Sequence, residues 1–360
     1  MLETKIMPYN DSDKNHMEFF LQAPEKIGFL LMNIGTPSEP TTKAVRSYLT
    51  EFLSDPDVID TNPLLRWIIV NLFVSPFRPR RVLPQYKSIW MEKGSPLLVH
   101  SNEFKESLMR YDNDLLVNIG MRYGQPSIQE AIDELLESGA QRIVMCPMFP
   151  QYAQATTGSC LSKAIEILEN RNVSYQTITD FFRERFYIDC LVGTIRESTA
   201  YKNSEMLLFS FHGLPERQIK KLDSSGSYCL VDKNCCDSES TYNKFCYRFH
   251  CTDTVNKIME KLNTSKPFKI CFQSRFGMDK WIQPDILDVL QQTVDDGIND
   301  IAVVCPSFVA DCLETLEEIS IRDQEYFSRI GGGKLTLVPS LNSSPKWVSG
   351  FAKFIAGKIA

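Results

Sequence analysis

The sequence predicts an α/β fold of two similar halves, each built on a parallel β-sheet. Short apolar runs of strand length alternate with helix-length segments, which is the pattern of parallel sheets with helical crossovers. Three strand-and-turn landmarks of the first half recur in the same order in the second half. Two such halves facing each other would place their strand-end loops around one shared cleft, where open α/β sheets bind their ligands.

Each landmark is an apolar strand followed by a sharp turn. The first ends in Gly-x-Pro, the second in an Arg-aromatic-Gly sequence, and the third in Cys-Pro. Three matches in one order are difficult to attribute to chance, so we expect both halves to share one topology. The matched pairs are Leu31–Pro37 with Phe209–Pro215, Met121–Gly124 with Ser274–Gly277, and Cys146–Phe149 with Cys305–Phe308.

The individual elements follow from periodicity and from turn residues. Ser127 followed by Glu130 forms a capping box, which predicts a helix beginning at that point. Apolar runs predict strands within Ile27–Ile34, Leu115–Ile119, Arg142–Cys146, Leu207–Phe211, Lys269–Phe272 and Gly297–Val304. Further helices are expected over Thr41–Phe52, Ser101–Arg110 and Thr157–Asn170.

The composition of the chain excludes some classes of function and indicates the compartment. A net charge of -6 and the lack of a dense Lys/Arg run argue against general nucleic-acid binding. Met1–Gln22 is polar and has no continuous apolar core, so it predicts a loosely ordered extension over residues 1–25 and no secretory signal. Eleven cysteines in such a chain indicate a reducing compartment, so we expect a cytoplasmic protein.

One apolar stretch, Leu64–Val74, lies in a long connection and is interrupted by two polar residues. It is too short to span a bilayer, which takes about 20 apolar residues. Either it is a core helix, or it is an interfacial helix that touches a membrane. Its place in a long connection favours an exposed lip. The interruptions are Arg66 and Asn71, and the basic residues that follow are Arg78, Arg80 and Arg81.

The strongest functional signal is His212, at the carboxyl end of an apolar strand. The turn Gly213-Leu214-Pro215 ends the strand abruptly, so the imidazole lies on the edge where parallel sheets form ligand crevices. The alternative is a core histidine bonded to a backbone carbonyl. Position alone favours the functional interpretation.

Three carboxylates follow the third landmark of the second half. Asp311, Glu314 and Glu318 are spaced three and four apart, so a helix would carry them on one face with Asp311 near its start. A solvated acidic turn is the alternative, but the repeat places this segment at the same cleft as His212. An imidazole opposite a row of carboxylates can hold a divalent metal transiently or remove protons.

A polar segment of 23 residues holds five of the eleven cysteines. Thiolates this close together suit an iron–sulfur cluster or zinc. The alternative is a surface loop with one structural cysteine, for which Cys251 is the best candidate, and idle neighbours. The five are Cys229, Cys235, Cys236, Cys246 and Cys251.

Together these residues resemble ferrochelatase, the family that inserts ferrous iron into a porphyrin to make haem. The resemblance runs from residue 26 to the end of the chain and is closest to Gram-negative bacterial members. The motifs that carry it are Asn33–Pro37, Ser88–Leu97, Met121–Gly124, Pro150–Tyr152, Thr156–Ser159, Ser210–Pro215, Phe272–Gly277 and Ala310–Leu316.

The resemblance implies two similar Rossmann-like domains with four-stranded parallel sheets flanked by helices. The domains are expected to be related by a pseudo-twofold axis, with a porphyrin cleft between them. The first spans 26–177 with a hydrophobic lip at about 61–90, and the second spans 178–339 with the cysteine-rich insert 229–251. Residues 340–360 are expected to form a helix that packs back on the first domain. A monomer and a homodimer remain equally open.

The resemblance also assigns roles to residues. It makes His212 and Glu314 catalytic. The same two residues, together with Asp311 and Glu318, are the expected ligands of ferrous iron. Cys312 stands where several relatives have a histidine, so no second histidine is expected at the site. Positions that match the porphyrin pocket are Ile34, Arg122, Tyr123, Tyr152 and Ser210.

The implied substrate is protoporphyrin IX. Members that use coproporphyrin tend to have a tyrosine at the position of Ile34 and to lack a long lip, and an apolar lip suits a substrate that partitions into membranes. A chelatase for coproporphyrin or cobalt remains an alternative. So does a non-catalytic porphyrin-binding redox sensor, although a sensor would not need both His212 and the acidic row.

A two-iron, two-sulfur cluster is implied because some bacterial members bind one through internal cysteines. Four ligands from the five cysteines of the insert leave the choice between Cys235 and Cys236 open. His250 is a further candidate to replace one of them.

Overall fold

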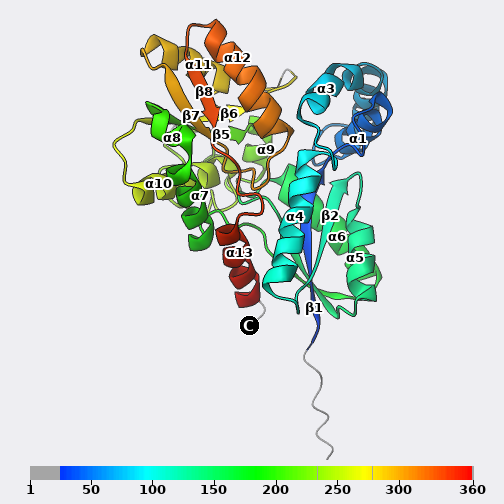
Figure 1. The fold of residues 1–360 in the computed structure, drawn as a ribbon. Helices are drawn as coiled ribbons and strands as arrows, with labels where there is room; N and C mark the ends of the chain where they lie inside the picture. Colours follow the sequence, from blue (N-terminus) through cyan, green and yellow to red (C-terminus); the bar gives the residue numbers. More distant parts are fainter. Residues whose placement is uncertain (1–24, 233, 278, 359–360) are drawn as a thin grey trace, which may run out of the picture.

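The computed structural model describes residues 25–232, 234–277 and 279–358, so the extension expected before them lies outside the described residues. Within these ranges the chain forms two four-stranded parallel sheets, with strand orders β2-β1-β3-β4 and β6-β5-β7-β8 (Figure 1). The predicted two-part α/β fold is confirmed. The strands are β1 (Ile27–Gly35), β2 (Leu116–Tyr123), β3 (Arg142–Pro147), β4 (Ser174–Thr177), β5 (Met206–His212), β6 (Phe268–Gln273), β7 (Asp300–Val304) and β8 (Lys334–Leu337).

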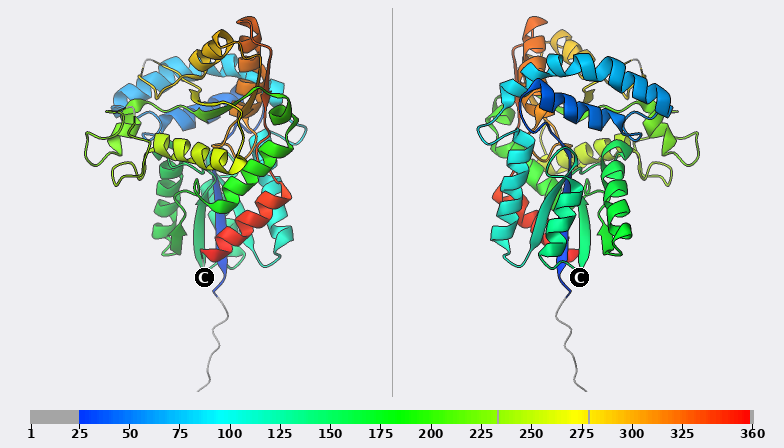
Figure 2. Two further views of the ribbon diagram at one scale, coloured as in Figure 1. Left: turned by 90° about the vertical axis from the view of Figure 1, so that its left-hand side faces the viewer. Right: turned by 90° about the vertical axis from the view of Figure 1, so that its right-hand side faces the viewer.

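Helices connect the strands and cover the sheets on both sides (Figures 1 and 2). Those of the first half are α1 (Thr42–Ser54), α2 (Pro63–Ile68), the π-helix η1 (Ile69–Val74), α3 (Ser75–Ile89), α4 (Pro96–Tyr111), α5 (Ile128–Glu137), the π-helix η2 (Gln154–Gly158) and α6 (Ser159–Asn170). Those that follow are α7 (Arg185–Glu197), α8 (Thr199–Asn203), α9 (Glu216–Lys221), α10 (Tyr247–Leu262), α11 (Ile286–Asp295), the π-helix η3 (Glu314–Asp323), α12 (Gln324–Arg329) and α13 (Pro345–Gly357).

The repeated landmarks occupy equivalent places in the two sheets. β1 and β5 are the second strands of their sheets, and each runs into its Gly-x-Pro turn. The link from the neighbouring strand to the next helix is also the same, since Met121 N donates to Pro126 O at 2.7 Å and Phe272 N donates to Pro284 O at 2.9 Å. The capping box at the start of α5 is present as predicted.

Alternate side chains of the central strands fill different layers of the core. Leu30 and Met32 of β1 pack with α5 and α6 on one face of the first sheet. Phe29 and Leu31 point to the other face and belong to a larger cluster that continues through Phe209 of β5 in the second half. One hydrophobic core therefore joins the two halves.

The C-terminal helix α13 seals this shared core. It lies between α4 of the first half and α7 of the second (Figure 1). Trp347 stacks on Phe104 of α4 and on Phe186 of α7, with ring centroids 5.5 Å apart in both cases. The helix thus packs on elements of both halves.

The predicted lip is a helical excursion made of α2, η1 and α3, packed on α1. Both side views show α1 and α3 across the end of the molecule beside α12 (Figure 2). The inner side of α3 buries Tyr86 against Tyr48 and Leu49 of α1. No helix of the described residues is both long and apolar enough to cross a membrane. The exposed apolar side chains of the lip are Leu64, Leu65, Trp67, Leu72, Phe73 and Phe77.

The acidic segment differs from the prediction. Asp311 lies before the helix, which begins at Glu314 and is a π-helix over Glu314–Asp323. A π-helix bonds residue i to i+5, so a turn holds more residues than the roughly 3.6 of an α-helix. The expectation of one helical face shared by Asp311, Glu314 and Glu318 is therefore wrong for Asp311.

Candidate active site

His212 is the last residue of β5, at the strand end predicted for it, and is only partly buried. Its Nδ1 lies 2.6 Å from the carbonyl oxygen of Gly213. Because a carbonyl only accepts, Nδ1 carries the proton, and Nε2 is the basic nitrogen of the neutral ring. The backbone thus fixes the tautomer that a proton acceptor needs.

Glu314 opens η3 and lies close enough to His212 for the two charges to interact. Burial raises the pKa of Glu314 above its usual range, the neighbouring Glu318 raises it further, and His212 lowers it. A carboxyl of this kind can change protonation nearer to neutral pH than an exposed one. The structure therefore brings together the imidazole and the carboxylate that the sequence singled out.

Glu318, one turn further along η3, is held by three donors. Its Oε2 accepts hydrogen bonds from Ser274 Oγ at 2.5 Å and Gln273 Nε2 at 3.3 Å, and pairs with Arg322 Nη2 at 3.2 Å. Charged donors and hydroxyls of this kind stabilise the ionised form of a carboxylate. Glu318 is thus held in one position beside Glu314.

Asp311 is occupied by structural contacts instead of facing the same space. Its Oδ2 accepts from Asn342 Nδ2 at 2.8 Å, and its Oδ1 accepts from Thr315 Oγ1 at 3.0 Å and Ser340 N at 3.3 Å. These bonds tie the start of η3 to the segment that leads into α13. The role of Asp311 as an iron ligand stays a prediction without support from its contacts.

A pocket of about 30 Å³ lies between the end of β1, the lip and the start of η3. Ile34 and Glu314 both line it, together with Tyr48 and Tyr86 of the lip region. Ile34 therefore lies in the same pocket as Glu314, and its role in binding the porphyrin stays a prediction. Ser210, predicted to bind substrate, is fully buried and donates to Gln273 Oε1 at 2.7 Å, so its contact is with the protein interior.

Arg122 and Tyr123 meet Asp55 in a buried network. Asp55 Oδ2 accepts from Arg122 Nη2 at 2.5 Å, from Tyr123 OH at 2.7 Å and from Ser159 Oγ at 2.7 Å. Burial alone would raise the pKa of Asp55, but these bonds, led by that from Tyr123, lower it below its usual value. The network fixes the end of α1 to β2 and α6. The predicted porphyrin contacts of Arg122 and Tyr123 stay predictions.

Tyr152, the remaining predicted pocket residue, is partly buried and links the first half to the cysteine-rich insert. Its hydroxyl donates to Gln154 Oε1 at 2.9 Å, and its backbone N–H donates to His250 Nδ1 at 3.1 Å. The other nitrogen of His250, Nε2, donates to Lys244 O at 2.7 Å, and the ring stacks on Phe182. Both nitrogens of His250 are therefore used, which argues against His250 as a cluster ligand.

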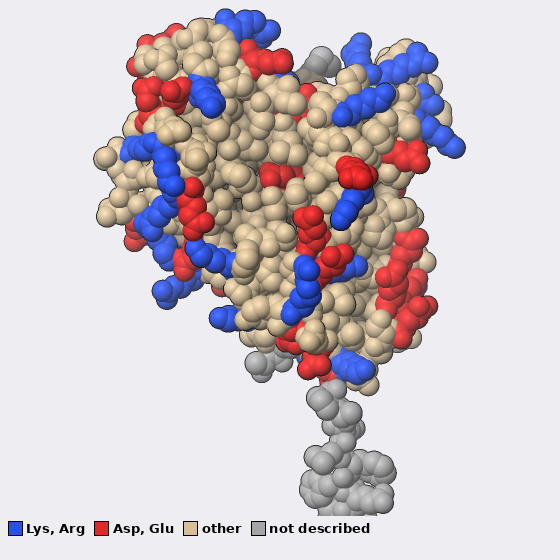
Figure 3. Space-filling model, viewed as in Figure 1, with Lys and Arg blue, Asp and Glu red and all other residues tan. Residues whose placement is uncertain are grey.

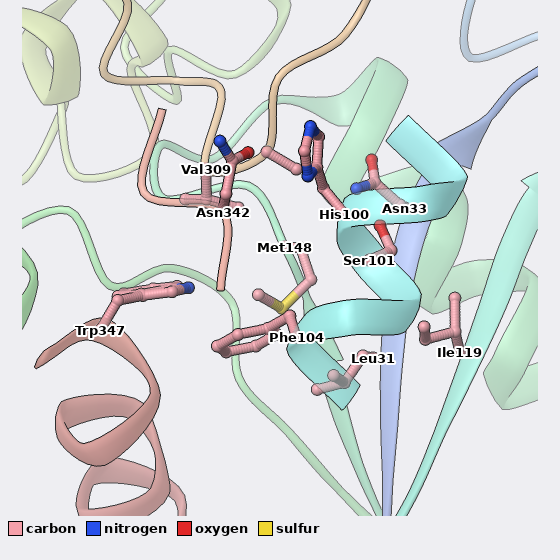
Figure 4. Close-up of a pocket in the computed structure, with 11 residues that line it drawn as sticks. Leu31, Asn33, His100, Ser101, Phe104, Ile119, Met148, Val309, Asn342 and Trp347 are labelled. Carbon is pink, nitrogen blue, oxygen red and sulfur yellow. The ribbon is translucent and has the colours of Figure 1, made fainter. Parts of the chain in front are cut away.

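A second, smaller cavity of about 20 Å³ is lined by residues of β1, α4 and α13, among others (Figure 4). Asn33, His100, Ser101 and Asn342 form its polar end, and Trp347 lies at the apolar end with Phe104 (Figure 4). His100 bonds to Glu103 on its own helix, at 3.2 Å. Asn342, which holds Asp311, is the link between this cavity and the acidic segment.

Comparison with known proteins decides among the chemistries that this geometry allows. The family model described as Ferrochelatase matches residues 26–359. The chain belongs to the ferrochelatase family. It is therefore a metal chelatase that inserts ferrous iron into protoporphyrin to make haem, with iron and the porphyrin as its substrates.

Ferrochelatases of several bacteria are similar to the chain over nearly its whole length. That of Coxiella burnetii (strain Dugway 5J108-111) is 46% identical over 331 residues, which cover 91% of this chain and 92% of that protein. That of Bdellovibrio bacteriovorus is 39% identical over 334 residues, which cover 92% and 98%. That of Actinobacillus pleuropneumoniae serotype 5b is 39% identical over 342 residues, which cover 93% and 99%.

Among solved structures, "SirB from Bacillus subtilis with Fe3+" shares the fold of this ferrochelatase-family chain. The TM-score is 0.53 at 10% sequence identity, and the match covers 93% of this chain and 96% of that one. At this identity the likeness shows the two-domain architecture alone. It agrees with the two equivalent sheets described above.

Four of the five cysteines in the insert of this ferrochelatase-family chain lie together. The Sγ atoms of Cys235 and Cys236 are 3.8 Å apart, and Arg248 Nη1 lies within 3.8 Å of both. Interaction with the thiols of Cys229 and Cys236 lowers the pKa of Cys246, which caps the start of α10. Cys251 lies five residues further along α10, is fully buried, and interacts with Tyr247.

These cysteines do not form a site for a single metal ion. Among the residues that the structure describes, no group of three or more His, Cys, Asp or Glu side chains converges as such a site requires. A two-iron, two-sulfur cluster has a different requirement, because each iron takes only two cysteine sulfurs. Cys235 and Cys236 are one pair of neighbouring buried thiols, and Cys229 and Cys246 interact as a second, which fits that requirement.

Two residues of the site had not been singled out individually from the sequence. Asp55 lies far from Arg122 along the chain, and no spacing connects them. Gln273 belongs to the Phe272–Gly277 motif, whose repeat in the first half is carried by the Arg-aromatic-Gly sequence after it. The available signal was its polar amide in a strand that pairs with the strand of His212.

Proposed function

We propose that His212 is the base that removes the pyrrole protons during iron insertion, with Glu314 and Glu318 as the carboxylates that pass protons on or bring iron. The observation that carries this is the fixed tautomer of His212, whose Nε2 is left without the proton. The charge interaction between His212 and Glu314 supports one shared reaction space.

The two protons released by iron insertion can be taken up by these groups. A free porphyrin carries two N–H groups, and both N–H bonds break as the four nitrogens bind ferrous iron. The two protons must leave without competing with the metal. A neutral imidazole accepts one proton at a time near neutral pH, and a carboxylate can relay it to solvent.

Bending of the macrocycle completes the proposed mechanism. A flat porphyrin hides its nitrogen lone pairs from the incoming metal. Binding energy from the rest of the ring can offset a distortion that exposes them, which lowers the barrier to insertion. The apolar surroundings of Ile34, with Leu97 and Tyr86 in the same pocket, suit the apolar edge of protoporphyrin.

The test is an anaerobic absorption assay with protoporphyrin IX and ferrous iron. The wild-type chain is expected to convert the porphyrin spectrum to that of the iron complex, and the His212→Ala variant is not. Parallel assays with coproporphyrin and with cobalt show whether another tetrapyrrole or metal is preferred. Porphyrin binding without conversion by the wild type would favour the sensor alternative.

We further propose that the lip touches an anionic membrane surface. Residues 61–90 carry Arg66, Arg78, Arg80, Arg81 and Lys87 and no Asp or Glu. The space-filling view shows Lys and Arg gathered over α1 and α3 (Figure 3). Exposed Trp67 and Phe73 lie on the same excursion, and apolar side chains beside basic ones are the pattern of interfacial helices.

The full chain is expected to sediment with vesicles of phosphatidylcholine and phosphatidylglycerol, and less with phosphatidylcholine alone. The double variant Leu64→Glu/Leu72→Glu should lose most of this binding, at least about tenfold, because it places charge on the inserted face. Leu287→Glu on α11 is the matched control at an exposed leucine of the second half, and should bind as the wild type does. Equal binding by all three would contradict the proposal.

For the insert, we propose that Cys229, Cys235, Cys236 and Cys246 hold a two-iron, two-sulfur cluster. Their gathering in one buried group supports it, as does the nearby Arg248, which can offset the negative charge of the thiolates. Such a cluster would supply a one-electron acceptor at the surface. Iron insertion itself needs no electron transfer.

Anaerobically purified protein is expected to contain about two iron and two sulfide per chain and to be coloured. Cys246→Ala should abolish both, whereas Cys251→Ala should retain them, because Cys251 lies outside the gathered group. The comparison requires that both variants be folded, which far-ultraviolet circular dichroism shows. A wild-type protein free of iron and sulfide would end the proposal.

A further inference from the structure

We infer that Gln273 is the positioning residue that sets the carboxylates of η3 opposite His212. The inference rests on the proposed roles of His212 and Glu314 and extends them to a residue that contacts neither the porphyrin nor the metal. Gln273 is the last residue of β6 and is fully buried.

The side-chain amide of Gln273 is held at both ends. Its Oε1 accepts from Ser210 Oγ at 2.7 Å, and its other end faces the main-chain oxygen of Glu314, which only accepts, so that end of the amide is the donor. Its Nε2 then donates to the main-chain oxygen of Glu314 at 2.8 Å and to Glu318 Oε2 at 3.3 Å. One NH₂ group therefore binds the start of the π-helix and its second carboxylate.

The main chain of Gln273 holds the other reactive group. Gln273 is the register partner of His212 across β5 and β6. Its carbonyl oxygen accepts from Gly213 N at 2.8 Å, and Gly213 O is the acceptor that fixes His212 Nδ1. Gln273 thus contacts both the turn that orients His212 and the carboxylate-bearing start of η3. We infer that it sets the distance between them.

Few other side chains could occupy this position. Asparagine is one methylene shorter and could not span from β5 to η3. Glutamate has the right length but lacks the donor, and would face Glu318 and the oxygen of Glu314 with like charge. Both amide ends are satisfied without water, so the group is rigid in the way that accurate placement requires.

The test compares turnover with substrate binding. Gln273→Met keeps the length and volume but removes the donor, and we expect kcat for ferrous-iron insertion to fall about 10²-fold, as small misplacements of reacting groups do. The KM and the dissociation constant for protoporphyrin should stay within about twofold of wild type. Gln292→Met, the same change at an exposed position of α11, is the matched control and should leave kcat unchanged.

Gln273→Glu separates positioning from general support of the fold. It keeps the length of the side chain but removes the donor and places a negative charge beside Glu318, so it should lower kcat at least as much as Gln273→Met. A purely structural role would instead lower the melting temperature and the affinity for protoporphyrin together with kcat.

The outcomes distinguish this inference from the proposed function. If Gln273→Met is folded and has wild-type kcat, the positioning role is overturned while His212 keeps its own. If His212→Ala retains turnover, the proposed base is overturned whatever the Gln273 variants do. If kcat falls with an equal loss of porphyrin affinity, Gln273 supports binding and the inference fails.

Discussion

His212→Ala is expected to abolish measurable iron insertion while protoporphyrin still binds. Positioned acid–base groups typically contribute about 10²- to 10⁴-fold, and here the imidazole is the group whose tautomer the backbone fixes for proton acceptance. Loss of the side chain leaves the pyrrole protons without an acceptor on that side of the ring. The measurement is the initial rate of the spectral change under anaerobic conditions, with porphyrin binding followed separately by fluorescence.

His100→Ala is the matched histidine control. His100 lies on α4 beside the smaller cavity and bonds to Glu103, away from the reacting groups, so its loss should change the rate by less than about twofold. Retention of turnover by His212→Ala, with protein that binds porphyrin normally, would remove His212 from the mechanism.

Glu314→Gln is expected to lower the rate by about 10²-fold or more and to remove the acid limb of its pH dependence. Burial and Glu318 raise the pKa of Glu314, so in the wild type the carboxylate is protonated, and its contribution lost, at a higher pH than for an exposed glutamate. The rate should therefore fall as the pH drops through that raised pKa. Glutamine has nearly the same shape and cannot titrate.

Glu318→Gln tests the direction in which Glu318 shifts the pKa of Glu314. Removing its negative charge takes away one of the two causes that raise the pKa of Glu314, so the acid limb should move to lower pH. The ionisable groups that face Glu314 are Glu318 on η3, His212 on β5, Cys312 before the helix, and the phenols of Tyr48 and Tyr86. An acid limb that is unchanged in both variants would assign the titration to another group.

The strand framework and its repeat could be predicted because they depend on local apolar runs ended by turns. Leu207–Phe211 predicts β5 to within one residue at each end, and the Gly-x-Pro turn that follows places His212 at the strand end. The capping box at Ser127 is equally local, since both partners lie within four residues. Such signals need no knowledge of tertiary contacts.

The misjudged parts of the site depend on contacts between distant segments. The spacing of Asp311, Glu314 and Glu318 suits an α-helix, but bonds from Asn342 and Ser340 hold Asp311 outside the helix. Ser210 carries a hydroxyl like any cleft residue, and only the position of Gln273 shows that it points inward. Motif matching selects important positions without showing whether they meet the substrate or support those that do.

The seating of α13 on both halves restricts how a macrocycle can enter. A stacked aromatic set with Trp347 at its centre, together with a core that runs unbroken from β1 to β5, acts as a rigid base that prevents the sheets from swinging apart. We therefore expect a bound macrocycle to be accommodated by side chains around the pocket beside Glu314, without a change in the angle between the two sheets.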